Sequence, residues 1–192
     1  IPGVFAAVST DLPYGETALK LFEWGRVFIR KDSDELPEER FSLTGMIMGL
    51  ANLKEWYREE RPSDFYDAKG AAEALLKALG LRDLVFKKGR TPPWYLKEAS
   101  SAILLGDQTL GALGQVSPEA LRRFDVDATA VFVFEIDATV LIEKVTGDRA
   151  FESLAKFPAV YRDLSILAKR SVESARIQEI ILRQGRELVE SV

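Results

Sequence analysis

The sequence predicts an α+β fold, with a largely antiparallel sheet flanked by helices and a strand–helix unit at its C-terminal end. Several strand-like segments follow one another without regular strand–helix alternation, which favours antiparallel pairing over βαβ units. One segment carries a clear helical apolar stripe. The composition, 47% hydrophobic and 29% charged over 192 residues, is typical of one large globular domain or one and a half.

The segment Leu19–Ile29 is predicted to be the strand that organises the sheet, since it is dense in β-branched and aromatic residues. One of its faces is aromatic apart from one cation: Phe22, Trp24, Arg26 and Phe28. Glu23 lies on the other face, and a buried charge needs a partner. We therefore expect a central strand, charges paired within the sheet, and aromatic rings in the core rather than stacked on a base or an adenine ring.

The segments around this strand complete the first half of the prediction. Ile1–Ser9 is expected to be the end of a helix. Lys31–Arg40 is rich in charged residues and is predicted to be a solvated loop. Its acidic residues are expected to be exposed rather than to bind a cation. Phe41–Leu50 is a second strand, in which Gly45 and Gly49 suggest a bulge or a close backbone approach.

The clearest helix is Phe65–Leu79, with Ser63 or Asp64 as its cap and Gly80 as a stop signal. The later elements are predicted from turn and capping residues. They are a short strand at Leu84–Lys87, a hairpin of Ser101–Leu105 with Thr109–Leu113, a helix capped by Ser117, a buried strand at Ala130–Ile136, and a helix capped by Asp137.

A domain boundary is expected near residue 150, which divides the chain into 1–150 and 151–192. From Leu154 onward the chain holds seven Lys or Arg against five Asp or Glu, although the whole chain has a net charge of −4. A strand at Asp163–Ala168 and a long helix capped by Ser171 are predicted there. A unit of this size is too small for an independent core and is expected to be incomplete.

Composition excludes several classes of chemistry. The chain has no Cys and no His, so Ser-His-Asp catalysis and thiolate metal sites are excluded. Its glycines form no phosphate-binding loop, and its carboxylates form no metal pattern. Glu23 and Glu135 could form a carboxylate dyad, although an ion pair of each with Arg26 or a Lys is favoured. The chain begins Ile1-Pro2-Gly3 without a signal-peptide pattern or a membrane-spanning run, which predicts a fragment of a longer intracellular protein.

Five motifs, in order, resemble the β subunit of bacterial phenylalanyl-tRNA synthetase. Leu21 to Phe28 is similar to that family's strand Leu-Phe-Glu-Ile-Gly-Arg-Val-Phe. The other four are Ile1-Pro2-Gly3-Val4, Asp64-Phe65-Tyr66-Asp67-Ala68-Lys69-Gly70, Phe134-Glu135-Ile136-Asp137 and Lys156-Phe157-Pro158-Ala159-Val160-Tyr161-Arg162-Asp163-Leu164. The last resembles the opening of the family's ferredoxin-fold anticodon-binding domain.

The resemblance implies a class II aminoacyl-tRNA synthetase-like module without catalytic residues, followed by a partial ferredoxin-like unit. It implies no cofactor or metal in this fragment, and an (αβ)₂ cytoplasmic enzyme whose α subunit uses ATP and Mg²⁺ to activate phenylalanine. The acidic Phe134–Asp137 junction, where an active enzyme needs cations, agrees with this. Expected contacts with the α subunit are Ile1, Val4, Phe5 and Trp24. Expected contacts with tRNA(Phe) are Arg162, Lys169 and Arg170.

One segment departs from the family, and two other functions stay open. Where the family usually reads Leu-His-Pro-Gly-Arg-Ser-Ala, this chain continues from Leu96 with Lys97-Glu98-Ala99-Ser100, which places any role of that loop in doubt. The chain could instead be an RNA-binding module centred on its basic tail. It could also be an active nucleotide-using ligase with Glu23, Arg26 and Glu135 in its site.

Overall fold

The computed structural model describes residues 2–11, 18–31, 35–52, 55–57, 59–81, 83–128, 130–145 and 158–192, without the side chains of Thr10, Asp11 and Glu187. These residues belong to two compact units, Ile1–Ala150 and Phe151–Val192. Every strand of the described residues lies in the first unit.

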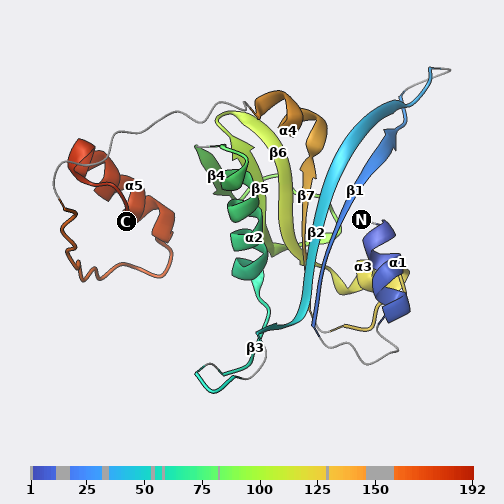
Figure 1. The fold of residues 1–192 in the computed structure, drawn as a ribbon, viewed down its shortest axis with the longest axis horizontal. Coiled ribbons are helices and arrows are strands. Elements are labelled where there is room, and N and C mark those ends of the chain that lie inside the picture. Colours follow the sequence, from blue (N-terminus) through green and yellow to red (C-terminus); the bar gives the residue numbers. More distant parts are fainter. Residues whose placement is uncertain are drawn as a thin grey trace. The chain divides into compact units, whose positions relative to one another are not determined.

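The first unit is built on a seven-stranded sheet (Figure 1). Its strands are β1 (Ala18–Ile29), β2 (Glu38–Asn52), β3 (Arg61–Pro62), β4 (Leu84–Lys87), β5 (Tyr95–Leu105), β6 (Gln108–Val116) and β7 (Val131–Asp137). The spatial order is β1-β2-β7-β6-β5-β4, and β3 pairs with β2. All pairings are antiparallel, so the predicted α+β class and antiparallel sheet are confirmed.

The expectation that Leu19–Ile29 is a central strand is wrong, because β1 lies at an edge of the sheet. It pairs with β2 along its whole length, from Ala18 opposite Gly49 to Ile29 opposite Glu38, and with no other described strand. The second strand is longer than predicted and begins at Glu38, inside the segment predicted as a loop. Together β1 and β2 form a long hairpin whose other neighbour is β7.

Two helices cover one face of the sheet. The predicted N-terminal helix is confirmed as α1 (Pro2–Asp11). The second helix, α3 (Pro118–Arg123), begins as predicted at Ser117, whose hydroxyl accepts a hydrogen bond from the Ala120 backbone N–H at 3.2 Å. One cluster joins both helices to the sheet through buried side chains, among them Val4, Phe5, Val8, Leu121, Met46 and Val131.

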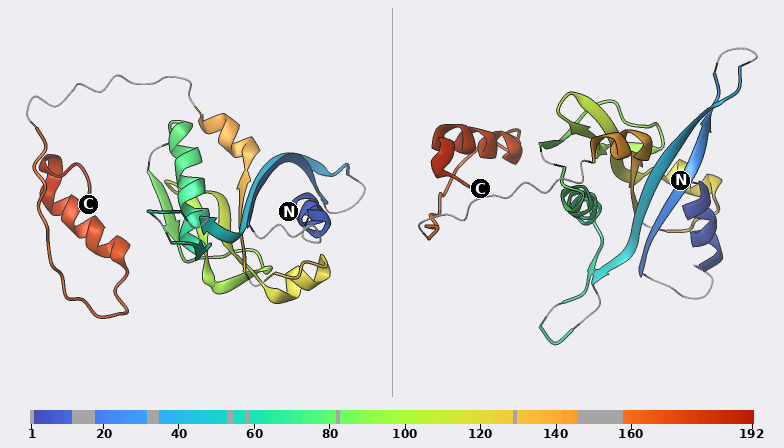
Figure 2. Two further views of the ribbon diagram at one scale, coloured as in Figure 1. Left: turned by 60° about the horizontal axis from the view of Figure 1, so that its bottom comes forward. Right: turned by 45° about the horizontal axis from the view of Figure 1, so that its top comes forward.

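The opposite face is covered by α2 (Phe65–Ala78) and α4 (Ala138–Lys144). Figure 2 shows α2 and α1 on opposite sides of the β1–β2 hairpin. The apolar stripe of α2 and the buried side of α4 pack on alternate residues of the central strands, including Ala72, Leu76, Leu141, Leu43, Leu113 and Ile136. Because side chains alternate along a strand, this core and the α1/α3 core lie on opposite sides of the same sheet.

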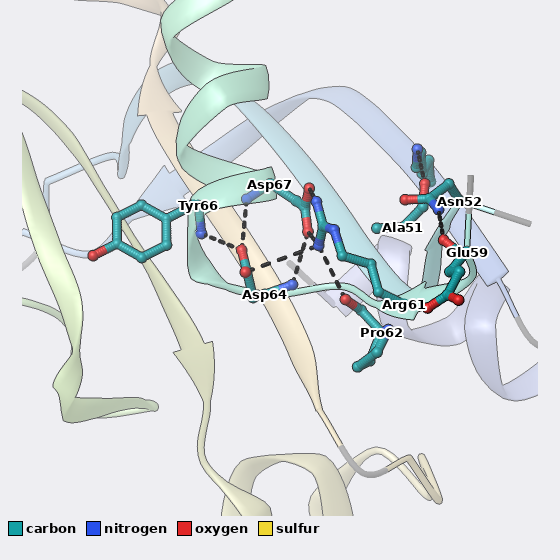
Figure 3. A network of polar contacts seen from close by, with 9 residues as sticks. Ala51, Asn52, Glu59, Arg61, Pro62, Asp64, Tyr66 and Asp67 are labelled. Carbon is teal, nitrogen blue, oxygen red and sulfur yellow. Dashed lines mark hydrogen bonds and ion pairs between the residues drawn. The ribbon is translucent and has the colours of Figure 1, made fainter. Parts of the chain in front are cut away.

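The N-terminus of α2 is fixed by a capping box (Figure 3). Asp64 Oδ1 accepts hydrogen bonds from the backbone N–H groups of Tyr66 and Asp67, at 2.8 and 3.1 Å. The Asp67 carboxylate in turn accepts a hydrogen bond from the Asp64 backbone N–H at 2.9 Å. It is also held by both terminal nitrogens of Arg61, each at 2.7 Å. The predicted cap is therefore present, and Arg61 adds a bidentate ion pair that the sequence pattern did not indicate.

The second unit contains α5 (Ser174–Gly185) and a 3₁₀ turn, η2 (Arg186–Leu188). The strand predicted at Asp163–Ala168 is not formed, and these residues are exposed coil. A strand needs a pairing partner, and the described part of this unit offers none. The helix begins after Glu173 rather than at Ser171, and Glu173 makes no side-chain capping bond. The ferredoxin-like unit is accordingly not confirmed.

Candidate functional site

Two carboxylates lie in one row across the sheet face that α1 and α3 cover. Glu23 on β1 is paired with Thr44 on β2, and Thr44 is paired in turn with Glu135 on β7. Partners in register share a face, but the intervening β2 separates the strands of the two acids by about 10 Å. The carboxylate dyad considered from the sequence is therefore not formed as a direct pair.

Arg26 lies on the opposite face from both carboxylates, since successive residues of a strand alternate. Its guanidinium lies over the Phe41 ring, 5.3 Å from the centroid, and Nη1 is 3.3 Å from Glu39 Oε2. Glu23, Arg26 and Glu135 thus do not converge on one site. The expected ion pairs of Glu23 and Glu135 with Arg26 or a Lys are also absent among the described residues, so this expectation is wrong.

Asp137 secures the junction between β7 and α4. Its Oδ1 accepts hydrogen bonds from the backbone N–H groups of Thr139 at 3.0 Å and Val140 at 3.2 Å, as predicted for a cap. Its Oδ2 lies 3.3 Å from Arg40 Nη1. Arg40 Nε also bonds Glu38 Oε1 at 2.6 Å, which lowers the pKa of Glu38 and raises the pKa of Arg40. The cation nearest this junction is therefore paired with two acids.

The polar residues on β2 were not identified as a site from the sequence. Arg40, Ser42 and Thr44 occupy every second position of β2 and alternate there with Phe41, Leu43 and Gly45, which is the signal that indicates one polar face. In the structure the Ser42 hydroxyl donates to Glu135 Oε1 at 3.2 Å. These side chains make this face of β2 polar from Arg40 to Thr44, next to the apolar α1/α3 core that begins at Met46.

A cavity of about 660 Å³ opens on this face. Its walls are mostly apolar and come from α1, β1, α3 and the turn before β5; they include Phe5, Val27, Trp94 and Phe124. Its charged lining residues are Glu135, Glu119 and Arg123. Arg123 Nη2 is paired with Glu119 Oε1 at 2.7 Å, so the described residues that line the cavity leave no cation unpaired for a phosphate chain.

The aromatic face of β1 is exposed, contrary to the expectation of a core position. Phe22 is 79% exposed, Phe28 62% and Trp24 48%. The Trp24 ring stacks on Phe41 of β2, with centroids 5.8 Å apart. The helices α2 and α4 pack on strands further into the sheet, so they leave this edge uncovered. We call the residues Phe22, Trp24 and Phe28 the aromatic edge.

The residues predicted to contact a second subunit have different environments. Val4 and Phe5 are buried in the core of this chain, at 4% and 1% exposure, because α1 packs on the sheet. Ile1 lies outside the described residues. Trp24 is left as the residue of this set that offers surface to a partner.

The basic residues of the tail are exposed and form no shared site. Arg162 Nη1 donates to the Tyr161 carbonyl at 3.1 Å, and Lys169 and Arg170 follow in the same exposed segment. No ion pair links any of the three to an acid among the described residues. In the same part of the chain that the structure covers, no three Asp or Glu side chains gather as metal ligands. None of the helices in the described ranges is long and apolar enough to cross a bilayer.

Comparison with known proteins assigns the chain to a family. The model of the phenylalanyl tRNA synthetase beta chain CLM domain matches residues 1–138. The chain belongs to the phenylalanyl-tRNA synthetase β-chain family. It is 32% identical over 189 residues to the phenylalanine–tRNA ligase β subunit of Geobacter sulfurreducens, covering 94% of this chain and 24% of that protein. The Bacillus subtilis β subunit is 29% identical over 193 residues, covering 100% of this chain and 24% of that one.

This member of the β-chain family spans about a quarter of the length of those relatives. Among solved structures, a pyrrolysyl tRNA synthetase from Desulfitobacterium hafniense superposes with a TM-score of 0.51 at 13% identity, covering 74% of this chain and 48% of that chain. A likeness at this identity shows the fold alone. The antiparallel sheet with its flanking helices is thus shared with a tRNA synthetase.

The segment Lys97–Ser100, which was expected from the sequence to differ from the family pattern, is part of β5 rather than a loop. Strand β5 shifts register against β6 between Tyr95 and Ser100. The Ser100 side chain is buried, and its hydroxyl lies 3.0 Å from the Thr91 hydroxyl. Residues 97–100 are therefore accommodated as part of the sheet.

Proposed function

We propose that this chain is the non-catalytic scaffold and interface module of a phenylalanine–tRNA ligase β subunit, which supports the catalytic α subunit in tRNA(Phe) aminoacylation. The complete enzyme in this proposal is a cytoplasmic (αβ)₂ assembly whose α subunit uses ATP and Mg²⁺. The β-subunit names of the relatives support the assignment to a ligase subunit. Because the chain covers about a quarter of their length, the activity belongs to the complete assembly.

The aromatic edge carries the interface part of the proposal. Phe22, Trp24 and Phe28 expose large apolar surfaces side by side on one strand, in a sheet whose inner strands are covered. Such contiguous apolar patches mark interaction surfaces, and aromatic residues are enriched at the centre of protein interfaces. Arg26 lies within the patch and adds a polar contact of the kind that interfaces also favour. A protein subunit is therefore the partner that this surface fits best.

The charges on the sheet face support a role without catalysis. Adenylate formation requires cations that hold a triphosphate and stabilise the transferring charge. On this face Arg40 is paired with Glu38 and Asp137, and Arg123 is paired with Glu119. Glu135 adds a negative charge to the cavity lining. This arrangement disfavours a bound triphosphate.

A second candidate function is RNA binding by the tail, which the exposure of Arg162, Lys169 and Arg170 favours. Replacement of Arg162 and Lys169 by Ala would then weaken binding of tRNA in a salt-dependent manner. If the chain acts only as a scaffold, the double variant binds tRNA as the unchanged chain does.

Capture of a purified α subunit by the immobilised chain tests the main proposal. We expect retention of the α subunit at physiological ionic strength, because a surface dominated by apolar contacts depends little on salt. Failure to retain the α subunit, with the chain shown to be folded by circular dichroism, would count against the interface role.

A further inference from the structure

The cavity on the α1/α3 face has the size and lining of a small-molecule site. Its volume of about 660 Å³ lies within the range of ligand pockets, which is roughly 300–1,000 Å³. Phe5 and Phe124 form one rigid wall, since their rings stack with centroids 4.9 Å apart. Val27 and Trp94 add apolar surface. Walls of this kind select a ligand with an apolar body.

Among the described residues that line the cavity, Glu135 is the charged side chain without a counter-charge. Glu119 and Arg123 neutralise each other by their ion pair at the exposed rim. Glu135 accepts a hydrogen bond from Ser42 on Oε1, and no described residue donates to its Oε2. A partly buried carboxylate with one unpaired oxygen favours a cationic hydrogen-bond donor as its ligand.

We propose that this cavity binds a small primary amine that carries an aromatic or branched apolar group. The ammonium lies against Glu135, and the apolar body lies between the Phe5–Phe124 wall, Val27 and Trp94. The site requires no catalytic step and does not depend on contact with another subunit. It also excludes anions, because the cation in its lining is already paired.

Three probes of similar size and different charge test the proposal on the intact chain: benzylamine, benzyl alcohol and benzoate. Two-dimensional ¹H–¹⁵N spectra report binding through the Trp94 indole N–H, which a Trp94→Phe variant assigns. Benzylamine is expected to shift this signal with a Kd at least about tenfold below those of the other two probes. Equal affinity for benzylamine and benzoate, or no shift at about 10 mM benzylamine, would overturn the proposal.

A pair of carboxamide variants separates Glu135 from an acid outside the lining. Glu135→Gln is expected to raise the Kd for benzylamine about tenfold and to leave that for benzyl alcohol unchanged. Glu98→Gln, at an exposed residue of β5 that does not line the cavity, is expected to change neither Kd. An unchanged Kd for benzylamine in Glu135→Gln would overturn the assignment. The three-probe series on the unaltered chain decides the charge preference even if Glu135→Gln fails to fold.

Discussion

Gly111 on β6 approaches the backbone of Glu135 on β7 so closely that a Cβ atom at Gly111 would lie 2.0 Å from the Glu135 carbonyl oxygen. The same atom would lie 2.9 Å from Ile136 Cα. Both obstacles are backbone atoms of a central, buried strand, so neither can move without disturbing the pairing of β6 with β7. Glycine at this position lets Glu135 keep its place in the cavity lining.

Replacement of Gly111 by Ala is expected to lower the free energy of unfolding by about 2–3 kcal/mol, since overpacking in a core forces backbone shifts. Gly25→Ala on β1 is the matched control, because a Cβ there meets nothing within 4 Å. The control should change stability by less than about 0.5 kcal/mol. Urea denaturation of the two variants measures the difference, and equal stabilities would contradict the close approach.

The Arg61–Asp67 pair predicts a defined pH dependence. The hydrogen bond from Arg61 lowers the pKa of Asp67 below its ordinary value of 3.8. The ion pair therefore stabilises the fold fully above pH 3.8 and loses its contribution as the pH falls through the lower folded-state pKa. Asp67→Asn should cost about 1 kcal/mol at neutral pH and progressively less as the solution is acidified below that range.

Chemical denaturation of both proteins between neutral and acid pH measures this effect. Lys69→Gln serves as a control, since its Lys69–Glu73 pair lies further along the same helix and takes no part in the cap. A stability difference for Asp67→Asn that is independent of pH would mean that the carboxylate charge does not contribute.

Tyr95→Phe is expected to leave stability unchanged or to raise it by about 1 kcal/mol. The hydroxyl that this change removes is buried and has no hydrogen-bond partner among the described residues, so its desolvation cost is not repaid. Thermal unfolding monitored by near-ultraviolet circular dichroism measures the change. A loss of more than about 1 kcal/mol would show that the hydroxyl is in fact hydrogen-bonded.

Isothermal titration of the chain with ATP, with and without phenylalanine, is expected to show no binding at about 1 mM. The reason is that Arg40 on β2 and Arg123 at the cavity are already paired with acids. Saturable binding of both ligands together would contradict the non-catalytic role.

The sequence predicted most helix caps, because capping depends on backbone groups two or three residues away. Ser117 and Asp137 cap the helices that they were expected to cap, and Asp64 rather than Ser63 caps α2. The cap expected at Ser171 is not formed, since α5 begins after Glu173. The strands were found for a similar reason, since alternation and β-branched residues are local signals. Strand ends were less well predicted, as the early start of β2 at Glu38 shows.

The errors concern what covers each surface. The aromatic residues of β1 have the pattern of a buried strand face. The local sequence does not indicate whether that face is covered by this chain or by a partner protein. Val4 and Phe5 show the converse, since these apolar residues of a short helix were expected to face a partner and are buried in the core of this chain. Leu164 and Ile166 alternate as in a strand, but pairing requires a neighbouring strand that the described part of their unit does not contain.

The affinity of the chain for a purified phenylalanine–tRNA ligase α subunit tests the central claim most directly. We expect Phe22→Asp and Trp24→Asp each to raise the Kd at least about tenfold, because a charge in the aromatic edge would be desolvated on binding. Trp56→Asp, at an aromatic residue that is 95% exposed but outside this edge, should leave the Kd within about twofold. If the folded Phe22→Asp and Trp24→Asp variants both bind the α subunit like the unchanged chain, the aromatic edge is not the interface and the central claim is wrong.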